Sequence, residues 1–171
     1  VQAWTLWLIR SSRPGDAASL FHIFTSVVRD HDVGIAQYLL PHLVLHILIS
    51  GSSQQRRTVL GESLAVLADQ AHPALGYEPE RRRLTAQTLF HVLDHVGHWM
   101  RRMRLVPLRM ARRSRWRDAL SDVQAIMDEL SPDLLAQASL QCDAYARALL
   151  HFEYRIRAMR PPVSYTHLRA H

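Results

Sequence analysis

The chain has 171 residues, enough for one domain with an ordinary hydrophobic core, and its net charge is +6 at pH 7. All 21 basic residues are arginine, so the phosphate-gripping lysine of protein kinases and of Walker-type loops is absent. The six glycines form no phosphate-cradling array, and the single cysteine, Cys142, excludes an intrachain disulfide and a cysteine-based zinc site. We therefore expect no nucleotide site in this chain.

Apolar residues recur at helical spacing in every long segment, and alternating runs bounded by hairpin turns do not occur. This pattern predicts an all-α fold. A first helical stretch covers 1–10, and a second helix is expected over 16–29. The inward face of the second helix should consist of Leu20, Phe24, Val27 and Val28.

The segment 33–49 is apolar nearly all round, which predicts a helix packed on several sides. Its longest apolar run, 39–49, contains His42 and His46 and is about half as long as a membrane span requires. We therefore expect a soluble chain with no membrane contact.

Three amphipathic helices should follow, over 53–71, 80–104 and 118–130. The expected inward stripe of the first consists of Val59, Leu60, Leu64, Leu67 and Ala68. The second has the clearest two-faced pattern, with an apolar side made of Leu89, Val92, Leu93, Val96, Trp99, Met100 and Met103.

A final helix pair is expected after Ser131, a natural N-cap that precedes Pro132. Its second helix carries an apolar stripe for a neighbouring helix to cover, made of Tyr145, Ala148, Leu149, Phe152, Ile156 and Met159. Helices separated by short breaks favour an antiparallel helical-repeat solenoid of the HEAT/TPR-like kind. A closed helical bundle is the alternative, because no strict repeat occurs at a fixed period.

Three stretches carry a family resemblance: YLLPHLVLHIL at 38–48, TLFHVLDH at 88–95, and ASL…AYARALLHFE at 138–153. They resemble the phosphatidylinositol-3-kinase-related protein kinases of the DNA-damage checkpoint, and the last resembles the opening of the FAT region of that family. The resemblance implies HEAT-like repeats over 1–130 and the first TPR-like FAT repeat over 131–160. The tail, 161–171, resembles translated sequencing-adapter DNA; a disordered native linker is the alternative.

The resemblance also implies a function. The chain would be a fragment of a checkpoint serine/threonine protein kinase, a non-catalytic scaffold that supports kinase assembly and regulation through protein contacts. Other helical repeats of the same chain would be its direct partners. The parent kinase would act in the nucleus, use ATP and magnesium, and assemble as a dimer with a regulatory subunit. No catalytic residue and no cofactor site is expected in the segment itself.

His91, His95 and His98, together with Asp94, invite a metal-site hypothesis, because histidines one helical turn apart can reach one ion. On a helical wheel these residues lie opposite the apolar side of the helix, which favours a solvated face. We therefore predict no metal site. For His42 and His46 we also predict no metal site; they are interpreted as hydrogen-bonded histidines at the edge of the core.

Eight arginines with no acidic residue between them occupy the segment 101–117, and this local charge exceeds the net charge of the whole chain. They are candidates for contact with a polyanion, and support an alternative function as a helical nucleic-acid-binding module. The candidates are Arg101, Arg102, Arg104, Arg109, Arg112, Arg113, Arg115 and Arg117. A solvated helix end is the competing interpretation. The shorter cluster at 81–83 is expected to pair locally with Glu78 and Glu80.

Overall fold

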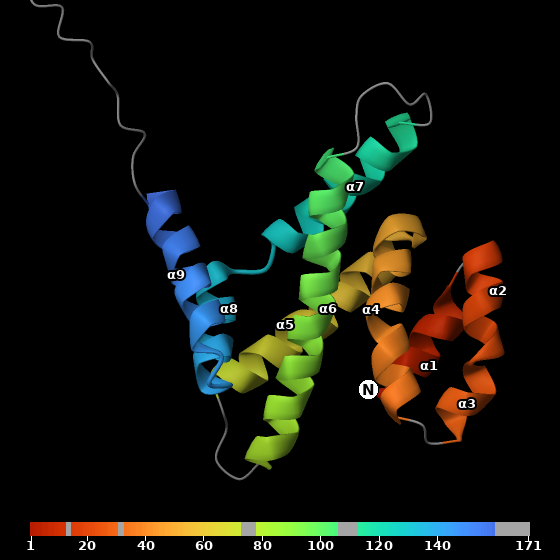
Figure 1. The fold of residues 1–171 in the computed structure, drawn as a ribbon, viewed down its shortest axis with the longest axis horizontal. Coiled ribbons are helices and arrows are strands. Elements are labelled where there is room, and N and C mark those ends of the chain that lie inside the picture. Colours follow the sequence, from red (N-terminus) through yellow and green to blue (C-terminus); the bar gives the residue numbers. More distant parts are fainter. Residues whose placement is uncertain (13–14, 31–32, 73–77, 106–112, 160–171) are drawn as a thin grey trace, which may run out of the picture.

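The computed structural model describes residues 1–12, 15–30, 33–72, 78–105 and 113–159, in which every regular element is a helix (Figure 1). The all-α prediction is therefore confirmed. The helices are α1 (Gln2–Ser11), α2 (Asp16–Ile23), α3 (Thr25–Arg29), α4 (Val33–Ser50), α5 (Ser53–Ala71), α6 (Pro79–Leu105), α7 (Arg113–Asp128), α8 (Pro132–Gln141) and α9 (Tyr145–Met159).

Helix α4 is the central element of the first half of the fold. It contacts α1, α2, α3, α5, α6 and α7, as its apolar circumference predicts. Its buried side chains are Ala36, Leu39, Leu40, Pro41, Leu43, Val44, Ile47 and Leu48. All of them except Pro41 belong to one hydrophobic core, which also contains residues of α1, α2, α3, α5, α6 and α7.

The length of α4 corrects one expectation. Over its 18 residues the mean hydropathy is 1.6, so by length and composition alone α4 is the one described helix that could cross a membrane. The short run at 39–49 gave the opposite impression because the helix also includes 33–38. Core helices of soluble proteins pass the same test, and α4 contacts six neighbouring helices, with 44% of its residues buried.

Helix α6 belongs to two cores. Its first half packs Ala86, Leu89 and Phe90 against α5 and α8. Its second half packs Val92, Val96 and Met100 against α4 and α7. Figure 1 shows α6 as a long continuous helix in the middle of the molecule, so the two cores share one element. The predicted apolar side of this helix is confirmed for its buried members.

The predicted helix over 16–29 is wrong in two respects. The chain forms α2 and α3 instead, because the Phe24 amide donates to the Phe21 carbonyl at 3.1 Å and tightens the turn between them. The predicted inward face is correct for Val28, which is buried, but wrong for Leu20 at 57% exposure and Val27 at 38% exposure, and Phe21 is buried instead. The outward apolar side chains leave this end of the molecule with an uncovered face.

Helix α5 begins at a capping box. The Ser52 hydroxyl accepts from the Gln55 amide, and the Gln55 side chain accepts from the Ser52 amide, so both orphan amides are satisfied. The same Gln55 side chain donates to the Ser11 carbonyl at 2.5 Å and ties α5 to the end of α1. The predicted stripe on α5 is correct for Val59, Leu60 and Leu67, but Ala68 is exposed and Ala71 is buried instead.

Helices α8 and α9 form a hairpin, with Ser131 at the N-cap position and Pro132 in the first turn, as predicted. The Ser131 side chain makes no cap hydrogen bond. Asp143 adopts a left-handed conformation with φ of 58°, and the following Ala144 amide donates to the Ser139 carbonyl at 2.9 Å. This geometry closes the C-terminus of α8 and turns the chain back along it.

The buried position of Leu43 on α4 makes a stability prediction. Leu43→Ala should lower the free energy of unfolding by about 2–5 kcal/mol, because Leu43 is 0% exposed and truncation leaves a cavity. The matched variant Leu84→Ala, at a side chain 60% exposed on α6, should change it by less than about 0.5 kcal/mol. Urea denaturation followed by circular dichroism measures both. Equal losses in the two variants would contradict the central position of α4.

Candidate functional site

The polar side of α6 contacts its neighbours rather than solvent alone. The His95 ring lies edge-on against the His42 ring of α4, with their centroids 4.5 Å apart. His42 in turn contacts Tyr38 one turn earlier on the same helix, with ring centroids 5.6 Å apart. His95 is half-buried, whereas His91 and His98 are exposed. The prediction of a solvated face is therefore correct for His91 and His98 and wrong for His95.

Asp94 links α6 to α9. The two guanidinium nitrogens Nη1 and Nη2 of Arg147 donate to Asp94 Oδ1 at 2.7 Å and to Oδ2 at 2.5 Å. The same guanidinium lies 4.9 Å from the centre of the Phe90 ring, one turn before Asp94. A two-pronged arginine–carboxylate pair fixes both distance and orientation. This pair could not be predicted from the sequence, because its partners are 53 residues apart.

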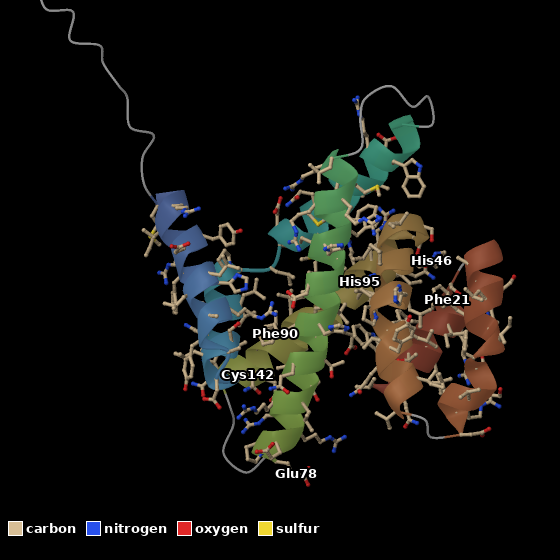
Figure 2. All side chains as sticks on the ribbon, in the orientation of Figure 1. Phe21, His46, Glu78, Phe90, His95 and Cys142 are labelled. Atoms are coloured by element: carbon tan, nitrogen blue, oxygen red, sulfur yellow. The ribbon has the colours of Figure 1, made fainter. Side chains whose placement is uncertain are left out.

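These contacts bear on the metal hypothesis. Within the described ranges, no group of three or more His, Cys, Asp or Glu side chains converges as a set of metal ligands. Asp94 is already engaged by Arg147, and His42 meets His95 through ring packing. The absence of a metal site stays a prediction. Figure 2 shows His95 where α6 lies beside α4, and His46 on the side of α4 that faces Phe21 of α2.

Burial lowers the pKa of several histidines. The pKa of His95 is lowered by desolvation first, and then by repulsion from His42, His91 and His98. Desolvation also lowers the pKa of His46, whose Nε2 lies 3.3 Å from the Ser50 hydroxyl. The pKa of His151 is lowered by desolvation and by the Arg147 charge, against an opposite effect of Asp94. The fold thus favours the neutral form of three histidines.

The arginine-rich segment is described only in part. Arg101, Arg102, Arg104 and Arg117 have exposed side chains. Arg104 Nη2 donates to the Gln124 side chain of α7, and in the described part of the chain none of these four pairs with an acidic residue. Arg109, Arg112 and the side chains of Arg113 and Arg115 lie outside the described residues. Contact with a polyanion stays a prediction for all eight.

The chain matches a family model described as the M-HEAT region of serine/threonine-protein kinase ATR, over residues 1–167. It is 28% identical to serine/threonine-protein kinase ATR of Oryza sativa subsp. indica over 90% of its length. It is 25% identical over 95% of its length to protein kinase rad3 of Schizosaccharomyces pombe, and 28% identical over 84% to ATR of Arabidopsis thaliana. The chain spans 7% of the rice and fission-yeast relatives and 6% of the Arabidopsis one. No solved structure matches it.

The match supports some of the predictions made from the sequence and leaves others untested. It supports a checkpoint-kinase fragment from a HEAT region, and gives no support to the alternative of a nucleic-acid-binding module. It spans the predicted boundary at residue 130, so the division into HEAT-like and FAT parts stays a prediction. The tail, 161–171, lies outside the described residues, and its assignment also stays a prediction.

The lowered histidine pKa values make a pH prediction. A histidine whose pKa falls below the unfolded value of about 6.5 stabilises the fold above that pH, and this stabilisation is lost as the pH decreases, because the unfolded chain then binds more protons. The melting temperature should therefore be lower at about pH 5 than at about pH 7.5.

His95→Gln should reduce this loss, since it removes one of the shifted groups, whereas His22→Gln at an exposed position of α2 should not. Thermal melts followed by circular dichroism across this pH range compare the two variants with the wild-type chain. A melting temperature that rises toward acidic pH would contradict the assignment.

Proposed function

Because the chain belongs to the family of the M-HEAT region of serine/threonine-protein kinase ATR, we propose that it is a non-catalytic scaffold segment of an ATR-like checkpoint kinase. Its role is to support kinase assembly and regulation through contacts between helices. The parent kinase phosphorylates serine or threonine in the nucleus with ATP and magnesium, as a dimer with a regulatory subunit. The absence of lysine from the whole sequence supports placing the chemistry elsewhere in that kinase.

One observation carries this proposal: the helix array has an uncovered apolar face at each end. At one end, α9 exposes Tyr145 (59%), Leu149 (66%), Ile156 (54%) and Met159 (65%) along one stripe. At the other end, α2 and α3 expose Leu20, Ile23 and Val27. Figure 1 places these helices at opposite ends of the long axis. Large exposed apolar stripes are typical of interaction surfaces, and uncovered faces at both ends are typical of helical repeats that stack on neighbours.

These four residues of α9 belong to the stripe that the sequence predicted for a neighbouring helix to cover. Of the other two predicted members, Ala148 is buried at 2% exposure and Phe152 is half-buried, and α9 packs against α8. The stripe therefore remains available for a further helix. We propose that the α8–α9 hairpin is the first TPR-like repeat of the FAT region, and that the next repeat covers this stripe.

Substitutions in the stripe test the proposal. In a full-length ATR-like kinase that contains this segment, Leu149→Asp and Ile156→Asp should reduce the amount of soluble kinase and its checkpoint signalling, because a charge would enter a helix interface. In the 171-residue chain alone, the same changes should alter the free energy of unfolding by less than about 0.5 kcal/mol, since both side chains are exposed.

Ala146→Asp is the matched control, because Ala146 is exposed on α9 but lies outside the stripe. Immunoblotting measures the kinase level, and phosphorylation of checkpoint substrates after replication stress measures signalling. If the stripe variants leave both at the control level, the stripe is not an interface in the kinase and the proposal fails.

A further inference from the structure

The α8–α9 hairpin is attached to the rest of the fold mainly through α8. Side chains of α8 belong to the hydrophobic core that α5 and α6 share, whereas in the described part of the chain no side chain of α9 belongs to either core. Helix α9 packs on α8, and Arg155 Nη1 of α9 lies 2.7 Å from Oδ1 of Asp133 in the first turn of α8. The orientation of α9 relative to α6 therefore depends on few contacts.

The turn between α8 and α9 is held by an arginine near the start of α6. Arg83 Nη1 donates to Asp143 Oδ2 at 2.7 Å, and Asp143 lies in this turn. The sequence-based expectation that the arginines at 81–83 pair locally with Glu78 and Glu80 is therefore wrong for Arg83. This pair holds the turn, but it involves no residue of α9 itself.

Arg147 is the residue of α9 that pairs with α6 directly. Its guanidinium donates to both carboxylate oxygens of Asp94 and lies over the Phe90 ring, and within the described ranges no other residue of α9 forms a hydrogen bond or ion pair with α6. Phe90, labelled in Figure 2, is 4% exposed and belongs to the core, so its ring is a fixed surface. A planar guanidinium held by two hydrogen bonds and a ring has little freedom to rotate. These three residues form the Arg147 clasp.

The clasp lies on the opposite side of α9 from the exposed apolar stripe. With 3.6 residues per turn, Arg147 is about 160° from Leu149 and about 180° from Ile156 around the helix. Leu149 is 66% exposed and Ile156 is 54% exposed. Holding Arg147 against α6 therefore directs the stripe away from α6.

We propose that the Arg147 clasp sets the rotation of α9 about its own axis, so that the stripe faces the next helical repeat. The docking part of this inference rests on the proposed function, whereas the setting of α9 does not. Arg147 is a positioning residue in this role, because it contacts α6 and acts on a surface on the far side of its own helix. Asp94 is about half exposed, so the clasp adds little to the stability of the fold and acts on its geometry.

The distance between α6 and α9 tests the clasp in the 171-residue chain. Gln87→Cys on α6 and Glu153→Cys on α9, both at exposed positions, carry spin labels in a Cys142→Ala background, and pulsed electron paramagnetic resonance measures the distance between them. The clasped chain should give one narrow distance distribution. Arg147→Gln should broaden or shift this distribution while the melting temperature changes by only a few degrees.

Three further variants separate geometry from charge and from folding. Arg155→Gln is the matched control, because it removes the same charge from α9 but its partner Asp133 lies on α8, and it should keep the distribution narrow. Arg147→Lys keeps the charge but cannot form the two-pronged contact, so it should act like Arg147→Gln. Asp94→Asn opens the clasp from α6 and leaves α9 unchanged, so it gives the same test if Arg147→Gln does not fold. An unchanged narrow distribution in the Arg147 variants would overturn the proposal.

A measurement in a full-length ATR-like kinase tests the docking part. Arg147→Gln should lower phosphorylation of checkpoint substrates after replication stress, and Arg155→Gln should not. If the distance distribution broadens in the chain but the kinase signals normally, the docking part is overturned. If the variants of the exposed stripe lower signalling but the distance distribution of Arg147→Gln is unchanged, the proposed function stands and the clasp is overturned.

Discussion

The fold depends on one constraint: α4 has almost no polar face. A helix that is apolar nearly all round must be covered on every side, and the flanking helices are arranged to do so. Helices α1, α6 and α7 supply most of the cover, and their apolar stripes face α4. The exposed residues of α4 lie between Val33 and His42, and His95 of α6 contacts His42. The position of the histidine pair follows from the packing of α4.

The polar contacts between helices complement this core. Arg147 joins α9 to α6 at Asp94, Arg56 joins α5 to α7 at Asp122, and Arg83 joins α6 to the turn after α8. Each of these carboxylates is about half exposed, so each pair adds little stability by itself. Their value is geometric, since a guanidinium fixes the direction of approach.

Much of the fold could be predicted from the sequence because helical spacing is a local property. The burial of Val92, Val96 and Met100 follows from that spacing alone. The break at Phe24 could not be predicted, because one tightened turn leaves no mark in the spacing of apolar residues. The pairing of Asp94 with Arg147 could not be predicted either, since it depends on a helix that is distant in the sequence. The candidate arginines at 101–117 were read from composition, which identifies a charged segment but not its contacts.

The continuity of α6 has a mechanical consequence. At 27 residues and about 1.5 Å per residue, this helix is roughly 40 Å long, and both cores are attached to it. Arg83, which is paired with Asp143, is near one end, and the exposed arginines Arg101, Arg102 and Arg104 are at the other. Because one helix carries side chains of both cores, any tilt of α6 would disturb the packing of both at once.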